Sequence, residues 1–460
     1  MLHFKPALAF AVGALLMSAT APVTARDTLA RDERLARLAL AQTRLQMVKA
    51  ATATVIPPKR EEQLGALLYA DPNLSLNRNQ SCASCHALTP PRIKATPSRP
   101  TVAAFIDPRN TLTGSAVSAG SVKNRQGVLN APSVGYAAFS PPFHWNAVDG
   151  LYMGGQFWNG RATNLAAQAA EPFLNPHEMA MPDKASVVAR LQESKEYQRL
   201  FLQAFDLSLA QILTRKPYPR SGAIDAAYDA MTRAIAAFEK SRMFNRFTSK
   251  FDYSLAGLTT LSAAEQRGLE VFNGQGNCAA CHPATPTFAP DGSVMPPLFT
   301  DFSYDNIGLP RNIDIPGNPA PNRGLGGRAD IGARDASGAD IGKHKVMSLR
   351  NVALTAPYGH NGVLHTLAEV VHFYNTRDVL PRIADIHAKG FAVSAWPAPE
   401  IARNVNRDEL GALGLSAAQE ADLVSFLVTL TDGYAEWGRD PRVPRGTPSP
   451  YATMPFPPMP

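Results

Sequence analysis

Apolar positions recur at helical spacing in several separate stretches of this chain. In "LSAAEQRGLEVFNGQGN", Ser262 and Glu265 have the spacing of a capping box, and the apolar positions continue to Phe272. Near the end of the chain, "LSAAQEADLVSFLVTLTDGY" repeats the pattern, with Ser416 and Gln419 in the capping positions. The spacing predicts one capped amphipathic helix in each stretch.

Shorter or less regular patterns predict the other elements. "KREEQLGALLYADPNLSLNRNQS" predicts a short helix that ends at Asp71–Pro72. Helical runs also cover 27–56, 184–206 and 222–240. The stretch 305–343 is rich in Gly, Pro and Asp and predicts a long loop, and loops of that length are often functional.

Both ends of the chain differ from this pattern. His3 and Lys5 precede an apolar run over 7–20, and small residues then predict a signal-peptide cleavage after Ala25. The alternative is an uncleaved membrane anchor, but the run is shorter than the roughly 20 residues that a spanning helix needs. We expect export to the periplasm and no membrane span after cleavage. The final "RVPRGTPSPYATMPFPPMP" is too proline-rich for a helix or strand and is expected to lie extended over the surface.

Composition restricts the class of protein. The 460 residues are 45% hydrophobic and 18% charged, which favours a large buried core and two domains over one. The 39 prolines and 32 glycines indicate helices joined by long irregular connections. A formal charge of +7 without a dense Lys/Arg run gives nucleic-acid binding little support.

All four cysteines lie in two similar motifs, "QSCASCH" and "GNCAACH". An exported protein could instead form two disulfides, but the local spacing argues against this. The motifs begin at Cys82 and Cys278, too far apart in sequence for the paired cysteines of a zinc site. A C-x-x-C-H run is the signature of covalent haem c attachment, in which the histidine is the proximal iron ligand. The sequence therefore predicts two haem c groups, one on Cys82, Cys85 and His86 and one on Cys278, Cys281 and His282.

Each haem motif follows a helix and a loop, which is the plan of a c-type cytochrome. We therefore predict an all-α fold of two c-type cytochrome domains, each with one covalently bound haem, joined by long irregular loops. The boundary is expected near Asp252 to Thr260. The predicted parts are a signal peptide at 1–25, an N-terminal helical extension at 26–57, a first haem domain at 58–251, a second haem domain at 252–438 and a proline-rich tail at 439–460.

From about Lys59 to Tyr434, the chain resembles the bacterial di-haem cytochrome c peroxidases and their relative MauG. The resemblance rests on ordered motifs around the two haem sites: "LGALLYADPNLS", "GGQFWNGRATNLAAQA", "NPHEM", "GKHKVMSLRNVALTAPYGHNG" and "TLAEVVHFYN". It implies a peroxidase that uses hydrogen peroxide to oxidise a partner. Its first haem would react with peroxide and its second would transfer electrons.

The resemblance also assigns roles to single residues. Trp158 matches a tryptophan between the two haems that relays electrons. Gln168 and Glu178 match the glutamine and glutamate over the first haem, and Pro172 matches a proline on the same face. That glutamate is the acid and base for peroxide in the family, and burial near apolar walls would raise its pKa. His360 matches a histidine near this pocket, where it acts in the chemistry or positions the loop.

A calcium site is implied in the same way. Asn130 in "VLNA" and Thr355 and Pro357 in "LTAP" match positions that bind one calcium ion between the domains. Side-chain and carbonyl oxygens are the hard ligands that calcium prefers.

Two departures from the family favour the MauG-like branch. Members that need reductive activation carry a histidine upstream of "VLNA" that caps the first haem, and "GSAVSAGSVKNRQGVLNA" has none. The first haem is thus expected to be open, unless His144 in "SPPFHWNAVDG" replaces the cap. Tyr374 stands where ordinary members have a methionine ligand, and a phenolate favours higher oxidation states of iron. Met347 and His372 are the rival ligands.

The remaining histidines and tryptophans have no comparable context. We expect structural or surface roles for His177, His344, His365, His372, His387, Trp145, Trp396 and Trp437.

Three classes of function remain open. The favoured one is a periplasmic peroxidase whose partner is a protein substrate or a small electron donor, a cytochrome c or a cupredoxin. The alternative is a non-catalytic di-haem electron-transfer cytochrome, in which both irons have six ligands and Glu178 has no role. A third is a structural or sensing protein that docks a partner on the inserted segments 87–122 and 140–155.

Overall fold

The computed structural model describes residues 59–90, 102–212, 221–288, 294–317, 320–335 and 337–454. The predicted signal peptide, the helix over 27–56 and the last residues of the tail lie outside these ranges. Within them, no helix is long and apolar enough to cross a membrane.

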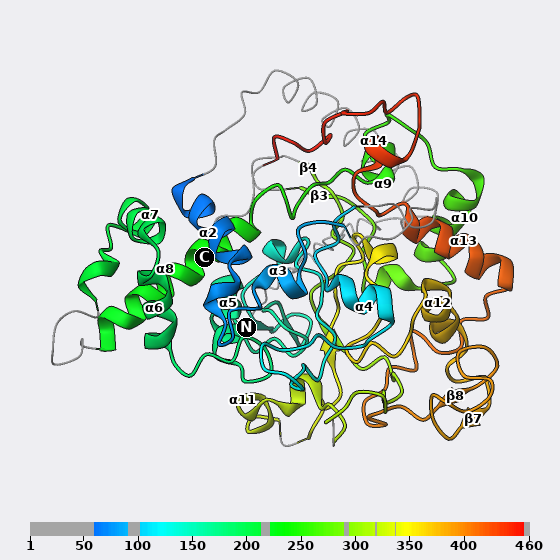
Figure 1. The fold of residues 1–460 in the computed structure, drawn as a ribbon. Helices are drawn as coiled ribbons and strands as arrows, with labels where there is room; N and C mark the ends of the chain where they lie inside the picture. The colour runs from blue at the N-terminus through cyan, green and yellow to red at the C-terminus, as the bar shows by residue number, and fades with distance from the viewer. Residues whose placement is uncertain are drawn as a thin grey trace, which may run out of the picture.

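Helices form two groups at opposite sides of the molecule (Figure 1). The longer helices of the first group are α2 (Arg60–Ala70), α5 (Leu165–Leu174), α6 (Lys184–Gln192), α7 (Lys195–Phe205) and α8 (Ser221–Glu239). The longer helices of the second are α10 (Ala263–Asn273), α12 (Leu367–Thr376) and α13 (Ala417–Val428). The short helices are α3 (Cys82–Cys85), α4 (Pro108–Thr113), α9 (Lys250–Leu255), α11 (Ala329–Gly332) and α14 (Tyr434–Trp437).

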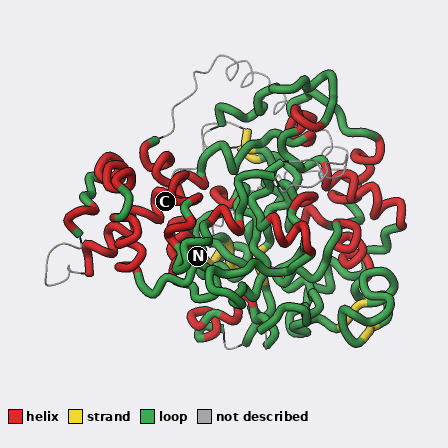
Figure 2. The backbone as a smooth tube through the Cα atoms, viewed as in Figure 1, coloured by secondary structure: helices red, strands yellow, loops and turns green. Residues whose placement is uncertain are grey.

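Loops fill most of the space between the two groups (Figure 2). Among the described residues the strands are two or three residues long and form two-stranded pairs, so helices carry the architecture. They are β1 (His144–Asn146) with β2 (Leu151–Met153), β3 (Thr287–Phe288) with β4 (Val294–Met295), β5 (Tyr304–Asp305) with β6 (His344–Lys345), and β7 (Arg382–Ile383) with β8 (Trp396–Pro397). The first three pairs are antiparallel and the last is parallel.

The same close helix crossing occurs in both groups. Gly65 of α2 lies against α8, where an added Cβ would be 1.9 Å from the carbonyl oxygen of Ala234. Gly268 of α10 lies against α13, where it would be 2.0 Å from the carbonyl oxygen of Asp422. A glycine inside a helix costs roughly 0.5–1 kcal/mol relative to alanine. Here it allows the helix backbones to touch, and in each group the helix that carries the glycine precedes a C-x-x-C-H motif in the sequence.

Two separate cores match these groups. The first contains apolar residues from Leu64 to Phe244 and packs α2, α5, α6, α7 and α8. The second contains apolar residues from Phe251 to Leu430 and packs α10, α12 and α13. The first of these cores ends at Phe244 and the second begins at Phe251. The domain boundary near Asp252 to Thr260 stays a prediction.

A buried network joins the two groups. The hydroxyl of Tyr136 donates to the carboxylate of Asp432 at 2.9 Å, and Asn351 donates to the same carboxylate at 2.8 Å. Close by, Arg350 forms a buried ion pair with Asp252 through two contacts of 3.0 and 2.9 Å. Arg350 also lies over the ring of Tyr136, 4.8 Å from its centroid. The contacts of Tyr136 with Asp432 and Arg350 therefore join the two halves.

Within the described residues, the predicted helices occur. Both capping boxes form, at Ser262 with Glu265 and at Ser416 with Gln419. The run over 184–206 is two helices rather than one, because the side chain of Ser194 accepts a hydrogen bond from the backbone of Tyr197 and starts α7.

Two loop predictions need correction. The stretch 305–343 contains a 3-10 turn at Gly324–Gly327 and the short α11, so it is not a featureless loop. The described part of the tail is not confined to the surface, because Tyr451 and Met454 are buried against Tyr136 and Phe247. Burial of these two side chains anchors this part of the tail to the body of the molecule.

Candidate functional site

The first C-x-x-C-H motif presents an oriented, buried histidine. Cys82 and Cys85 lie on α3, and His86 follows at its end. His86 Nδ1 is 3.3 Å from the carbonyl oxygen of Phe105, so Nδ1 carries the proton and Nε2 is left to bind a metal. Burial lowers the pKa of His86, which keeps the ring neutral as a metal ligand requires.

The second motif repeats this arrangement. Cys278 begins a 3-10 turn, and His282 Nδ1 is 2.7 Å from the carbonyl oxygen of Phe299. Burial again lowers the pKa of the histidine. Hydrogen bonding of the second ring nitrogen to a carbonyl is the usual way a protein orients a metal-binding imidazole.

Sequence reasoning missed the two residues that provide these carbonyls. Phe105 and Phe299 both have a left-handed backbone, with φ of 55° and 53°. That conformation is uncommon for a bulky residue and is maintained here by burial in the two cores. No sequence pattern predicts a phenylalanine with a left-handed backbone, so the sequence could not identify Phe105 and Phe299 as these hydrogen-bond acceptors.

All four cysteines are free thiols, so the disulfide alternative has no support. Burial in apolar surroundings raises the pKa of Cys85 to about 11 and those of Cys278 and Cys281 to about 12. Raised pKa values do not favour the thiolate form that an activated cysteine has.

One large cavity opens beside the second motif. Its walls bring together Cys278, Cys281, His282 and Tyr374. Much of the remaining wall is apolar, including Leu349, Val352, Leu364 and Val370. An apolar cavity with two cysteines at one edge and a histidine and a phenol in its wall fits a covalently attached haem.

Tyr374, one of the three candidate second ligands, lies on α12 and lines the cavity together with His282. Burial raises the pKa of its hydroxyl, which favours the neutral phenol over the phenolate. His372 is occupied elsewhere, because Nδ1 lies 3.1 Å from a Glu420 oxygen and Nε2 lies 3.1 Å from the Val393 carbonyl. Met347 lines the same cavity and remains a rival.

Trp158 connects the two halves at this cavity. Its indole Nε1 donates to the carbonyl oxygen of Asn130 at 2.8 Å, and its own carbonyl accepts from the backbone of Lys345 at 2.8 Å. It lines the cavity together with His282. The tryptophan is thus fixed by one segment from each half.

His360 is buried next to Trp158, with ring centroids 6.4 Å apart. Its Nε2 lies 2.9 Å from Glu400 Oε2, a partner that sequence reasoning did not find. The ring stacks on His344 at 3.6 Å with an interplanar angle of 5°. His344 is buried and lines the cavity, and burial, together with the neighbouring His360, lowers its pKa well below the usual range.

The residues expected over the first haem come from one helix and the turn after it. Gln168 and Pro172 lie one turn apart on α5, and the turn folds back so that Met179 donates to the Pro172 carbonyl at 3.1 Å. Glu178 Oε1 accepts from Asn175 Nδ2 at 2.8 Å. Burial raises the pKa of Glu178, partly opposed by Arg161.

Glu178 also lies close to the first haem motif. Its charge contributes to raising the pKa of both Cys82 and Cys85. The neighbouring His177 is exposed, and its Nδ1 lies 3.0 Å from the Gln126 carbonyl, as expected for a surface residue.

The candidate calcium residues meet at the junction of the two halves. Asn130, Thr355 and Pro357 all line the cavity. Asn130 Nδ2 donates to the Pro357 carbonyl at 2.7 Å, and Thr355 Oγ1 donates to the Val352 carbonyl at 3.1 Å. The Asn130 amide must therefore rotate before its oxygen can join the Pro357 oxygen on a cation.

The inserted segment 140–155 forms an exposed hairpin of β1 and β2. His144 is exposed there, and its Nδ1 lies 2.8 Å from the Pro142 carbonyl, which gives no support to a role as haem cap. Trp145 and Val148 are exposed on the same hairpin. His365 and His387 are exposed as well, whereas Trp396 is in the core.

Comparison with known proteins gives a consistent set of relatives. Residues 59–260 match the family described as di-haem cytochrome c peroxidase. The chain is 40% identical over 373 residues to the methylamine utilization protein MauG of Paracoccus denitrificans, covering 80% of this chain and 88% of that protein. It is 32% identical over 307 residues to the cytochrome c peroxidase Ccp of Escherichia coli, covering 66% of this chain and 50% of that protein.

Solved structures agree with this. The diheme peroxidase BthA of Burkholderia thailandensis superposes with a TM-score of 0.64 at 29% identity, covering 84% of this chain and 89% of that one. A MauG-like protein associated with microbial copper homeostasis superposes with a TM-score of 0.55 at 28% identity, covering 86% and 98%.

Proposed function

Because this chain belongs to the family of di-haem cytochrome c peroxidases and MauG proteins, we propose that it is a MauG-like enzyme that reduces hydrogen peroxide at its first haem site. Family membership makes it an oxidoreductase of the di-haem peroxidase type. In the proposal, oxidising equivalents pass through Trp158 to a second haem with His282 and Tyr374 as ligands, and a protein or small redox partner is then oxidised.

Each haem has a defined set of residues to hold it. Cys82 and Cys85 would form the two thioether bonds of the first, and His86 would give its Nε2 to the iron. Cys278, Cys281 and His282 would do the same for the second. When bound, the haem supplies an iron that exchanges electrons with peroxide and with a partner.

Glu178 is the proposed acid and base for peroxide. Its carboxylate would accept the proton from the inner oxygen of hydrogen peroxide and return it to the outer oxygen, which leaves as water. The raised pKa brings the group closer to the pH at which it must both take and give a proton. Gln168, on the preceding helix, would donate an amide hydrogen bond that orients the peroxide.

What supports the MauG-like assignment most is that Tyr374 shares a cavity with His282, while His372 is occupied by Glu420. A phenolate ligand is anionic and hard and stabilises oxidised iron, whereas a thioether favours the reduced form. We propose Tyr374 as the second ligand because a phenolate suits a MauG-like enzyme, and Met347 in the same cavity is the alternative.

The proposal includes one calcium ion at the junction of the halves. Asn130 would supply its side-chain oxygen, and Thr355 and Pro357 would supply their carbonyl or hydroxyl oxygens. We also propose that residues 1–25 direct the chain to the periplasm, where a small cytochrome c, a cupredoxin or a protein substrate would meet it.

A turnover assay tests the function. The protein as isolated, with both haems and without prior reduction, is mixed with a reduced cytochrome c or cupredoxin, and oxidation of this partner is followed with and without hydrogen peroxide. The proposal predicts continuous oxidation that depends on peroxide. Oxidation limited to one or two equivalents per protein and independent of peroxide would instead identify an electron-transfer cytochrome.

A further inference from the structure

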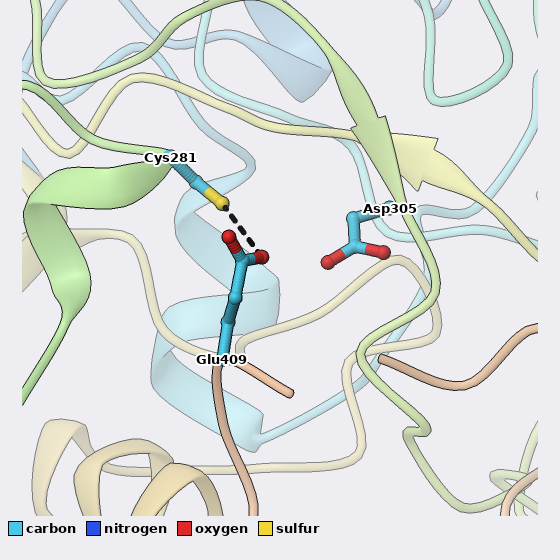
Figure 3. A group of neighbouring side chains, drawn as sticks. All are labelled: Cys281, Asp305 and Glu409. Atoms are coloured by element: carbon cyan, nitrogen blue, oxygen red, sulfur yellow. Dashed lines mark hydrogen bonds between the residues drawn. The ribbon is translucent and has the colours of Figure 1, made fainter. Parts of the chain in front are cut away.

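Two carboxylates lie beside the second haem motif. Asp305 at the end of β5 and Glu409 in the loop before α13 point toward the same space as the Cys281 sulfur (Figure 3). The Cys281 sulfur is 3.9 Å from Glu409 Oε2. One potential ligand atom from each of the three residues lies within 4.8 Å of the other two.

Neutral amides hold this pair in place. Asn406 Nδ2 donates to Asp305 Oδ2 at 2.7 Å and to Glu409 Oε2 at 2.6 Å, so a single amide bridges the two carboxylates. The backbone of Asn306 donates to the other Asp305 oxygen at 2.7 Å. Both Asp305 oxygens therefore accept hydrogen bonds, as expected of an ionised carboxylate.

No cation pairs directly with either carboxylate among the residues that the structure describes. Lys343, whose charge acts on Asp305, is itself paired with Asp340 at 3.1 Å, and Arg377 is paired with Asp378. The two carboxylates therefore have no direct ion-pair partner among the described residues.

The pair faces the haem cavity. Asp305 and Glu409 line it together with His282 and Tyr374, and the charge of Asp305 acts on the Tyr374 hydroxyl. A metal site at this cluster is excluded by the proposed function, because the Cys281 sulfur is used for the thioether bond. At this position the two carboxylates would interact electrostatically with the haem.

We propose that Asp305 and Glu409, positioned by Asn406, lower the reduction potential of the second haem and so maintain it in the oxidised state. Reduction by one electron removes one positive charge from the iron, and carboxylates at the cavity wall that have no direct ion-pair partner oppose that loss. This inference rests on the proposed function, which places a haem at Cys278 and Cys281. The pair would act together with the Tyr374 ligand.

The test is a spectroelectrochemical titration of the holoprotein. Asp305→Asn, Glu409→Gln and the double variant are compared with the wild type, and Asp149→Asn on the exposed hairpin is the matched control. At a fixed electrode potential, each single variant should raise the reduced-to-oxidised ratio of the second haem roughly tenfold, which is 59 mV for one electron. The first haem and the control variant should be unchanged.

The possible results distinguish a failure of this inference from a failure of the proposed function. An unchanged second-haem potential in both single variants and in the double variant, with wild-type spectra, would overturn the role of the pair. A wild-type protein whose second haem lacks the spectrum of a histidine–tyrosinate pair would instead overturn the proposed function. Because either single variant tests the charge, failure of one of them to take up haem leaves the other decisive.

Discussion

Replacing Glu239 by glutamine should remove a pH-dependent loss of stability from the first half of the molecule. Glu239 lies at the end of α8, is 4% exposed, and its Oε2 accepts no hydrogen bond from the residues that the structure describes. Burial raises the pKa of this carboxyl from 4.5 to about 8. The group lies close enough to the first haem motif for its charge to act on Cys82 and Tyr69.

The direction of the effect follows from proton linkage. Below pH 4.5 the carboxyl is protonated in both the folded and the unfolded chain and contributes no pH dependence. Above that pH the unfolded chain loses the proton while the folded chain retains it, so the free energy of unfolding falls until the pH reaches about 8. At 1.36 kcal/mol per pKa unit, the total loss is about 5 kcal/mol as an upper bound.

The assay is urea unfolding of the holoprotein at several pH values from 4 to 9, followed by haem absorbance. The Glu239→Gln variant carries the constant cost of a buried amide, but that cost does not change with pH. The difference between wild type and variant should therefore shift in favour of the variant by up to about 5 kcal/mol across this range. Glu196→Gln, on the exposed face of α7, should follow the wild type. Parallel curves for Glu239→Gln and the wild type would refute the reasoning.

Three further predictions concern the site and the junction. Glu178→Gln should slow the reaction with peroxide by about 10²–10⁴-fold. The wild-type rate should fall as the pH drops through the raised pKa of Glu178, because the ionised carboxylate is the base. Stopped-flow mixing with peroxide measures both rates. Trp158→Phe should slow electron transfer between the haems without slowing the first reaction of peroxide, which rapid-scan spectra of the two haems distinguish. Arg350→Met should lower the free energy of unfolding by about 3–5 kcal/mol, because it leaves the buried Asp252 carboxylate without its partner. Urea unfolding at pH 7 measures this free energy, and an unchanged unfolding midpoint would contradict the prediction.

The helices could be predicted because their signals are local. The caps at Ser262 and Ser416 lie within three residues of their partners, so the sequence alone specifies both ends of the interaction. The sequence did not predict the break inside 184–206, because serine occurs both inside helices and as an N-cap residue. The structure shows that the Ser194 side chain caps α7.

The site was predictable only where a short motif carries it. The two C-x-x-C-H motifs and the resemblance identify Trp158, Glu178 and Tyr374, although their roles remain proposals. Partners contributed by distant segments left no pattern. Glu400 reaches His360 across 40 residues of chain, and Asp305 meets Glu409 across more than a hundred, through contacts that only the folded chain brings together.

The measurement that tests the account most directly is a titration of the diferric holoprotein with stoichiometric hydrogen peroxide, without prior reduction, followed by EPR and absorbance. The account predicts an initial high-spin ferric signal from the first haem, a low-spin signal from the second, and loss of both on addition of peroxide. If neither signal changes until one haem has been reduced, a ligand caps the first haem and the account of an open, MauG-like site is contradicted.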